Sequence, residues 1–149
     1  KNSVIHGSGV FAAKDIVKCT KFIEYIGEKI SKEEGSKREK IQKELSEQNN
    51  SKGAVYILEL DDEYDIDGNF EYNHARLINH SCSPNCEIEI LDDKIWITAI
   101  RDIKNDEEIT FNYSFDLEEY KDHPCKCGSA NCVGYILDED YWSEIKKSA

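Results

Sequence analysis

The sequence predicts a single domain that is mostly β with one or two helices, so that by content it is α+β. A length of 149 residues fits one domain with a hydrophobic core. Short segments rich in β-branched and aromatic residues recur along the chain, and turn residues separate them. One long charged stretch instead has the apolar spacing of an exposed helix. The sequence contains no internal repeat and no low-complexity tract.

In the N-terminal third of the chain, the predicted order is turn, strand and helix. Residues 4–11 mix glycine with apolar residues, which indicates a turn between short strands, and residues 21–27 favour a strand. Ser31 followed by Glu34 forms a capping box, a side-chain pattern that starts a helix. We therefore expect a helix over residues 31–48.

This predicted helix contains a glycine, Gly35, which we expect to interrupt or delay it. A loop is expected after the helix, at residues 49–53. Residues 54–60 contain β-branched and aromatic residues and favour the next strand.

In the second half of the chain, alternation of apolar and acidic residues over residues 86–90 predicts a half-buried strand. The Asp92-Asp93 pair is expected to turn it into a second strand over residues 94–100. Residues 109–113 favour another short strand. Residues 138–146 favour a terminal helix, because acidic residues lie in its first turn and lysines in its last.

Three cysteines near the C-terminus, Cys125, Cys127 and Cys132, have a spacing that suits chelation of one metal ion, and Gly128 allows a tight turn between them. Tetrahedral zinc takes four ligands, commonly Cys or His, so a fourth must come from elsewhere. The candidates are Cys19, Cys82, Cys86 and His123. Six cysteines also permit a set of disulfides, but cysteines this close in sequence suit chelation better. Free thiols indicate a reducing compartment.

Six segments of the chain carry more specific motifs. In order along the chain they are residues 6–12 (HGSGVFA), 24–28 (EYIGE), 56–61 (YILELD), 76–86 (RLINHSCSPNC), 107–113 (EEITFNY) and 125–134 (CKCGSANCVG). Together they resemble the SET-domain family of protein-lysine methyltransferases, with a post-SET zinc cap and without a pre-SET module. One Gly-x-Gly segment is weak evidence by itself, but six motifs in family order are specific.

The resemblance implies a more specific fold, the SET-domain β-clip. This fold is built from several small curved sheets, with a pseudoknot where the Asn79–Cys82 loop meets the last strand. The SET domain is expected over residues 1–116, with a helical insert at about 31–53. A post-SET zinc-binding cap and the C-terminal helix are expected over residues 117–149.

The resemblance also implies transfer of a methyl group from S-adenosylmethionine to a lysine, which leaves S-adenosylhomocysteine. Tyr113 is similar in position to the catalytic tyrosine, and Tyr56 to a second tyrosine of the lysine channel. Phe111 lies at the position of an aromatic switch, where phenylalanine implies di- or trimethylation. Outside the resemblance, each of these three residues is equally an ordinary core aromatic.

The residues expected to bind the cofactor come from three parts of the chain. By resemblance they are Gly7, Ser8, Gly9, Arg76, Asn79, His80, Tyr113, Tyr135, Ile136 and Leu137. Asn112 lies where the family often has aspartate. Cys82 is the expected fourth ligand of one structural zinc ion, and His123 is its rival. Cys86 is expected to be a small buried apolar residue, because it alternates with isoleucines.

A net charge of −12, from 31 acidic and 19 basic residues, argues against binding to nucleic-acid phosphates. It favours a basic partner, such as a histone tail or a similar peptide, or it only maintains solubility. No apolar run is long enough to span a membrane. A chromatin-regulating enzyme of this kind is expected in the nucleus of a eukaryote. A microbial one is expected in the cytoplasm or secreted into a host.

Two other functions fit the same residues. A SET fold can hold peptide or cofactor without turnover, as a binding module. A structural zinc or redox protein would carry the cysteines with no cofactor. The oligomeric state, the target lysine and any flanking domains do not follow from the sequence.

Overall fold

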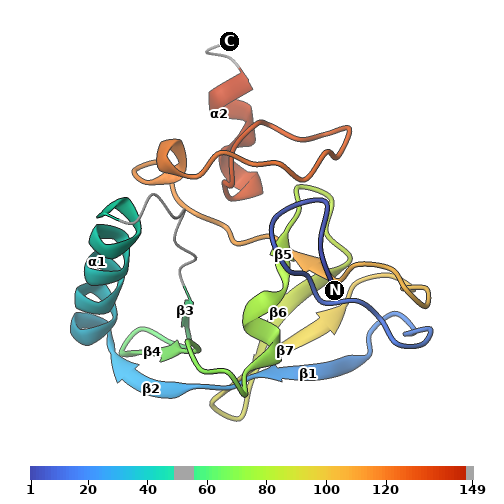
Figure 1. Ribbon diagram of the computed structural model, residues 1–149, viewed down its shortest axis with the longest axis horizontal. Coiled ribbons are helices and arrows are strands. Elements are labelled where there is room, and N and C mark those ends of the chain that lie inside the picture. Colours follow the sequence, from blue (N-terminus) through green and yellow to red (C-terminus); the bar gives the residue numbers. More distant parts are fainter. Residues whose placement is uncertain (49–55, 147–149) are drawn as a thin grey trace. The chain divides into compact units, whose positions relative to one another are not determined.

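The computed structural model describes residues 1–48 and 56–146, and it contains three small sheets (Figure 1). Their strand orders are β1-β7-β6, β2-β4-β3 and β5-β8. Helices are few and mostly short in the described residues, so the mostly-β prediction is confirmed. No helix among those residues is both long enough and apolar enough to span a membrane.

The elements follow one another along the chain in a regular order. Their bounds are β1 Lys21–Tyr25, β2 Glu28–Ser31, α1 Lys32–Gln48, β3 Ile57–Glu59, β4 Tyr64–Asp67, η1 His74–Leu77, β5 Asn79–His80, β6 Cys86–Leu91, β7 Lys94–Ala99, β8 Thr110–Phe111, η2 Tyr120–Asp122, η3 Glu139–Tyr141 and α2 Trp142–Lys146. The three η elements are 3-10 helices.

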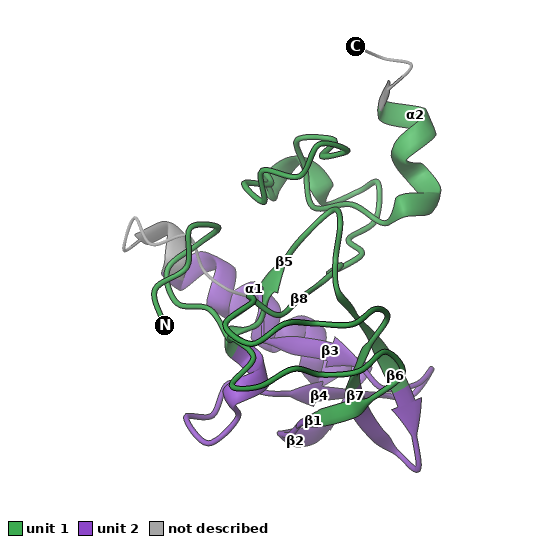
Figure 2. Ribbon diagram, turned by 90° about the vertical axis from the view of Figure 1, so that its right-hand side faces the viewer, with its two compact units in different colours: residues 1–23, 77–89, 97–149 green, residues 24–76, 90–96 purple. Residues whose placement is uncertain are grey.

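The chain divides into two compact units, coloured in Figure 2. Unit 1 comprises residues 1–23, 77–89 and 97–149, and unit 2 comprises residues 24–76 and 90–96. Strands β1, β6 and β7 each contribute residues to both units.

In unit 2, β4 is the central strand and pairs antiparallel with both β2 and β3. Helix α1 lies beside β2 and β4 and is attached largely through charged side chains (Figure 1). Arg38 binds carboxylates on Glu28 and Asp67, each at 2.7 Å, and Lys32 binds Asp65 at 2.7 Å. Because Asp65 and Asp67 are buried, these pairs are screened less than surface pairs.

Helix α1 begins as the capping box predicts, because the Glu34 N–H donates to the Ser31 hydroxyl at 3.3 Å. The expected interruption at Gly35 is wrong, and the helix continues through it to Gln48. A Cβ atom at Gly35 would overlap the buried carboxylate of Asp65. Gly35 therefore serves the close approach of the helix to β4. The loop predicted at residues 49–53 lies outside the described residues.

The predicted hairpin is present as β6 and β7, which are neighbours in their sheet. Asp92 and Asp93 have positive φ values of 52° and 57°, as a tight two-residue hairpin turn requires. The alternation predicted for β6 holds at Cys86, which is 1% exposed, but fails at Ile90, which is 51% exposed. Cys86 is thus the buried apolar residue that its position indicated.

Unit 1 joins segments that are far apart in the sequence. Strand β5 pairs in parallel with β8, so that Asn79 lies opposite Thr110 and His80 opposite Phe111. The N-terminal segment is tied to the same region by the isolated bridges Phe11↔Glu108 and Ile16↔Ile103. The expected strand at 109–113 is therefore shorter than predicted. Its pairing with β5 is the meeting of loop and last strand that the β-clip fold requires.

The expected terminal helix is present in two parts, η3 and α2. Asp138 caps the first part by accepting from the Asp140 N–H at 2.9 Å. The Trp142 indole donates to the Leu137 carbonyl at 3.0 Å and anchors the second part. Several short elements were not predicted, namely β2, β4, β5, η1 and η2.

Candidate active site and metal cluster

Tyr113 follows β8 and is held by both its backbone and its side chain. Its hydroxyl donates to the Ile78 carbonyl at 2.7 Å, directly before Asn79. Its ring packs against Phe111, with ring centroids 5.0 Å apart, and against His80 at 5.5 Å. The structure therefore brings Tyr113, Phe111 and the Asn79–His80 pair together within unit 1.

His80 is buried and links Tyr113 to the cysteines. Its Nδ1 accepts from the Tyr113 N–H at 3.3 Å, so the neutral ring carries its hydrogen on Nε2. Nε2 lies 3.5 Å from the Cys82 sulfur. Burial lowers the pKa of His80 to about 4, and the ring is therefore uncharged at neutral pH.

Asn79 binds three oxygens through its side-chain amide. Its Nδ2 donates to the carbonyls of His6 at 3.2 Å and Ser8 at 3.1 Å, and to Glu108 Oε1 at 2.8 Å. The predicted Gly-x-Gly segment is thus attached to the Asn79–His80 pair. Gly7 has a φ of +48°, which favours glycine, and its Cα faces open space.

Four cysteine sulfurs gather at one point of unit 1, all within 4.8 Å of one another: Cys82, Cys125, Cys127 and Cys132. Cys82 Sγ lies 3.8 Å from the sulfurs of both Cys125 and Cys132. Zn–S bonds of about 2.3 Å in a tetrahedron put sulfurs about 3.8 Å apart, so the donor set fits zinc. His123 lies outside this group and stacks on Phe115 at 3.9 Å, while Cys19 is exposed and Cys86 is buried.

Polar hydrogens point at these sulfurs. The N–H groups of Cys82, Cys127 and Gly134 donate to the sulfurs of Cys127, Cys125 and Cys132, each at 3.4 Å. The Ser129 hydroxyl lies 3.2 Å from Cys127 Sγ and 3.1 Å from the Ser81 hydroxyl. Burial raises the pKa of the Cys82 thiol to about 12, so its ionisation requires a nearby cation.

The segment after the cluster runs back toward the Tyr113 strand. Leu137 is fully buried, and its carbonyl accepts from the Asn112 amide at 3.3 Å. An aspartate at position 112 could not make this bond at neutral pH, because a carboxylate carries no hydrogen to donate. Tyr135 is 36% exposed and packs edge-on against Tyr120. The Ile136 N–H donates to the His123 carbonyl at 2.9 Å.

Two predicted site residues, Tyr56 and Arg76, lie in unit 2. The Arg76 guanidinium lies over the Tyr56 ring, 5.2 Å from its centroid. The Tyr56 carbonyl accepts from the Tyr25 hydroxyl at 2.7 Å, which fixes the backbone at this point. Arg76 Nε is buried and lacks a hydrogen-bond partner among the described residues. It remains a donor that an added acceptor could satisfy.

Comparison with protein families gives a match to the SET domain over residues 7–114. The chain belongs to the SET domain family. The matched range includes most of the motifs found in the sequence, and the cysteine-rich segment follows it.

Curated relatives of this SET domain are named as histone-lysine methyltransferases. It is 43% identical over 135 residues to "Histone-lysine N-methyltransferase 2D" of Homo sapiens, which covers 87% of this chain and 2% of the relative. It is 43% identical over 136 residues to "Histone-lysine N-methyltransferase trr" of Drosophila melanogaster, covering 87% of this chain and 5% of the relative. A relative from Emericella nidulans, named as specific for H3 lysine-4, is 37% identical over 140 residues, covering 90% of this chain and 11% of the relative. The chain thus spans a small part of the length of each.

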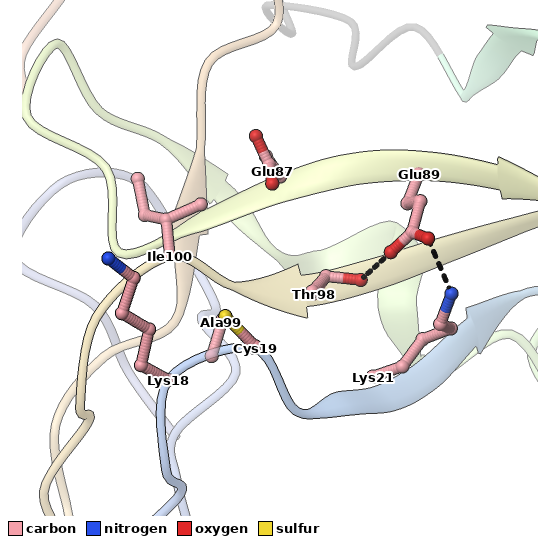
Figure 3. A pocket seen from close by; sticks show the side chains of 8 residues that line it. All are labelled: Lys18, Cys19, Lys21, Glu87, Glu89, Thr98, Ala99 and Ile100. Carbon is pink, nitrogen blue, oxygen red and sulfur yellow. Dashed lines mark hydrogen bonds and ion pairs between the residues drawn. The ribbon is translucent and has the colours of Figure 1, made fainter.

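Unit 1 of this SET domain also has an open pocket of about 610 Å³ on the β1-β7-β6 sheet. Glu89 lies at one side of it and accepts from Lys21 Nζ at 2.6 Å and from the Thr98 hydroxyl at 3.0 Å (Figure 3). None of the eight residues that line the pocket is a predicted site residue. The chemistry lies elsewhere, around Tyr113 and the cysteines.

Sequence reasoning did not find Glu108 or Ser129. Glu108 follows Glu107 in a charged run, and Ser129 lies in a turn, so neither has a pattern that separates it from surface residues. Both are found only through the partners that the fold gives them. The motif residues, in contrast, were found from their order along the chain.

Proposed function

We propose that the chain is the catalytic domain of an S-adenosylmethionine-dependent protein-lysine N-methyltransferase. The observation that carries the proposal is the fixed position of the Tyr113 hydroxyl, 2.7 Å from the Ile78 carbonyl and directly before Asn79 and His80. Family membership and the names of the relatives support it. We assign the SET domain to residues 1–116, with its insert at 31–53, and the post-SET cap to residues 117–149.

The proposed cofactor supplies an electrophilic methyl group on a positively charged sulfonium. The residues around Tyr113 fit such a group, because His80 is neutral and the charged side chain bound to Asn79 is a carboxylate. The proposed binding residues remain Gly7, Ser8, Gly9, Arg76, Asn79, His80, Tyr113, Tyr135, Ile136 and Leu137. The Asn79 amide already has protein partners and the Leu137 side chain is fully buried, so these two would act chiefly through backbone groups.

Methyl acceptance requires a neutral lysine, although the pKa of a free lysine is about 10.4. Aromatic walls disfavour the ammonium by desolvation, and a fixed tyrosine hydroxyl can orient the amine without adding charge. The Tyr113 hydroxyl donates its hydrogen to Ile78, and a phenol oxygen that donates can still accept one. Tyr113 would thus accept an N–H of the substrate amine. Tyr56 is proposed as the second channel tyrosine.

Phe111 lies against Tyr113 and is 4% exposed. A phenylalanine here brings no hydroxyl, which would hold a water molecule where further methyl groups must fit. We therefore propose di- or trimethylation. The proposed substrate is a histone tail or a similar basic peptide, which the net charge of −12 would attract, and the proposed location is the nucleus of a eukaryote.

We propose one structural zinc ion bound by Cys82, Cys125, Cys127 and Cys132. The ion would join residue 82, next to the Asn79–His80 pair, to a segment more than 40 residues later in the chain. Metal binding and completion of the site would then be coupled, because such a site forms only when its ligands are brought together.

The test is methyl transfer from labelled S-adenosylmethionine to core histones, with mass spectrometry to locate the modified lysine and count methyl groups. Tyr113→Phe should lower turnover by roughly 100-fold or more while cofactor binding is retained. Tyr72→Phe, a change at a 58% exposed tyrosine, is the matched control and should be neutral. If the wild-type protein binds the cofactor and methylates no basic protein, the chain is a binding module. If calorimetry shows no saturable heat with the cofactor, it is a structural protein.

A further inference from the structure

We propose that Glu108 is a positioning residue, whose carboxylate holds the Asn79 amide and thereby fixes residues 6–9 against the Asn79–His80 pair. The inference rests on the proposed function, because these two segments are the ones proposed to bind S-adenosylmethionine. Glu108 itself is assigned no contact with the cofactor.

The first observation is the crowding of acceptors around Asn79. Its amide nitrogen has two hydrogens but three oxygen partners, so one hydrogen is shared. The bond to Glu108 is the shortest of the three, at 2.8 Å. Its acceptor is a carboxylate, whereas the other two are backbone carbonyls. Charge-assisted bonds are the stronger kind, so Glu108 orients the amide and the amide then holds the carbonyls of His6 and Ser8.

The second observation is the space left by Gly9. A Cβ atom at this position would overlap the Glu108 carboxylate, and it would lie 3.0 Å from the Ser3 Cβ. Gly9 does not have the left-handed φ that favours glycine. Its missing side chain is therefore explained by the approach of Glu108, and not by backbone conformation. The second glycine of the Gly-x-Gly segment serves the protein itself.

The third observation is that the backbone on both sides of Glu108 is fixed to the N-terminal segment. The Ile109 N–H donates to the Val10 carbonyl at 2.8 Å, and the Ala12 N–H donates to the Glu107 carbonyl at 2.9 Å. These bonds set the strand but leave residues 6–9 to be held by side chains. The amide of Asn79 and the carboxylate of Glu108 supply that connection.

The first measurement is hydrogen exchange of residues 1–12 in the protein without cofactor. Glu108→Ala should accelerate exchange at this segment by roughly 10-fold or more, because it removes a charged hydrogen-bond acceptor. Glu108→Gln keeps an oxygen that can accept from Asn79 and should exchange like the wild type. Gly9→Ala should resemble Glu108→Ala, since it displaces the carboxylate. Glu118→Ala, at an exposed glutamate, is the control.

The second measurement is cofactor binding and turnover. Glu108→Ala should weaken S-adenosylmethionine binding by roughly 10- to 100-fold, with kcat at saturating cofactor changed by less than about threefold. Glu108→Gln should restore binding. If Glu108→Ala does not fold, Glu108→Asp, which withdraws the carboxylate by one methylene, replaces it and should show an intermediate effect.

Unchanged exchange and unchanged binding in Glu108→Ala would overturn the proposal. Equal losses in Glu108→Gln and Glu108→Ala would also overturn it, because charge rather than the accepting oxygen would then be decisive. If the wild-type protein binds no S-adenosylmethionine, the proposed function fails. The exchange measurement still decides the role of Glu108 in that case.

Discussion

Glu107 and Glu108 are adjacent in the sequence, but their side chains have separate partners. Glu107 pairs with Arg101 at 2.5 Å and accepts from the Asn85 amide at 3.1 Å and the Lys104 N–H at 3.0 Å. Burial by itself raises the pKa of Glu107. The three hydrogen bonds together outweigh burial and lower the pKa to about 2, from an ordinary value of 4.5.

This depressed pKa predicts how stability depends on pH. The folded state favours the ionised carboxylate, so its contribution is fully present above pH 4.5 and is lost as pH falls toward 2. Glu107→Gln should lower the free energy of unfolding at pH 7 by about 2 kcal/mol. The difference from the wild type should shrink as pH falls from about 4.5 toward 2 in urea titrations. A difference that is the same at both ends of this range would contradict the assignment.

At the residue scale, the sequence was most informative where a motif names the residue. Tyr113, Asn79 and His80 were found from motif order, and the fold brings them together. Glu108 was not found, because its role depends on the space beside Gly9. That space is a property of two backbones that approach each other, and no local pattern records it.

At the scale of elements, helix α1 shows a competition between local preference and packing. Alanine favours a helix interior over glycine by about 1 kcal/mol. At Gly35, however, a Cβ atom must displace the Asp65 carboxylate, which is buried and binds Lys32 at 2.7 Å. Since overpacking commonly costs about 1–3 kcal/mol, we expect packing to outweigh propensity here.

Gly35→Ala should therefore destabilise the protein by about 1 kcal/mol, measured by urea unfolding. Ser36→Ala, one residue further along the same helix at an exposed position, should be neutral or slightly stabilising. The double mutant Gly35→Ala/Asp65→Ala tests the cause, because the cost of Gly35→Ala should disappear without the carboxylate. Stabilisation by Gly35→Ala alone would show that α1 is held away from β4.

Which elements could be predicted follows from their length and from how local their signals are. The Ser31 cap and the Asp92-Asp93 turn are local, and α1 and the β6–β7 hairpin were predicted from them. Strands β5 and β8 have two residues each and pair in parallel although they are about 30 positions apart in the sequence. Hydrophobic periodicity cannot be read from two residues, so only the family resemblance indicated that these segments meet.

At the scale of the whole molecule, the cysteine cluster predicts a global effect of metal removal. Three of its sulfurs lie within eight residues of sequence, but Cys82 lies next to the Asn79–His80 pair. Chelation of the proposed zinc should lower Tm by roughly 10 °C or more and should accelerate hydrogen exchange at residues 78–82 as well as in the cap.

A matched pair of cysteine variants separates this effect from general thiol chemistry. Cys82→Ser should reduce bound zinc, measured by elemental analysis at about one ion per chain in the wild type, and should reproduce the loss of Tm. Cys19→Ser changes an exposed cysteine outside the cluster and should leave both unchanged. Full retention of zinc in Cys82→Ser would show that the fourth ligand is another group.

The interleaved chain path of unit 1 has a consequence for synthesis. Backbone bonds join Ile16 to Ile103 and Cys19 to Ala99, so residues 16–19 leave the ribosome at least about 80 residues before their partners. Unit 2, whose main stretch is continuous, can form first. The nascent N-terminal segment must wait without these partners until residues 97–109 emerge. At an elongation rate of about 5–20 residues per second, that wait lasts several seconds, during which chaperones have access to it.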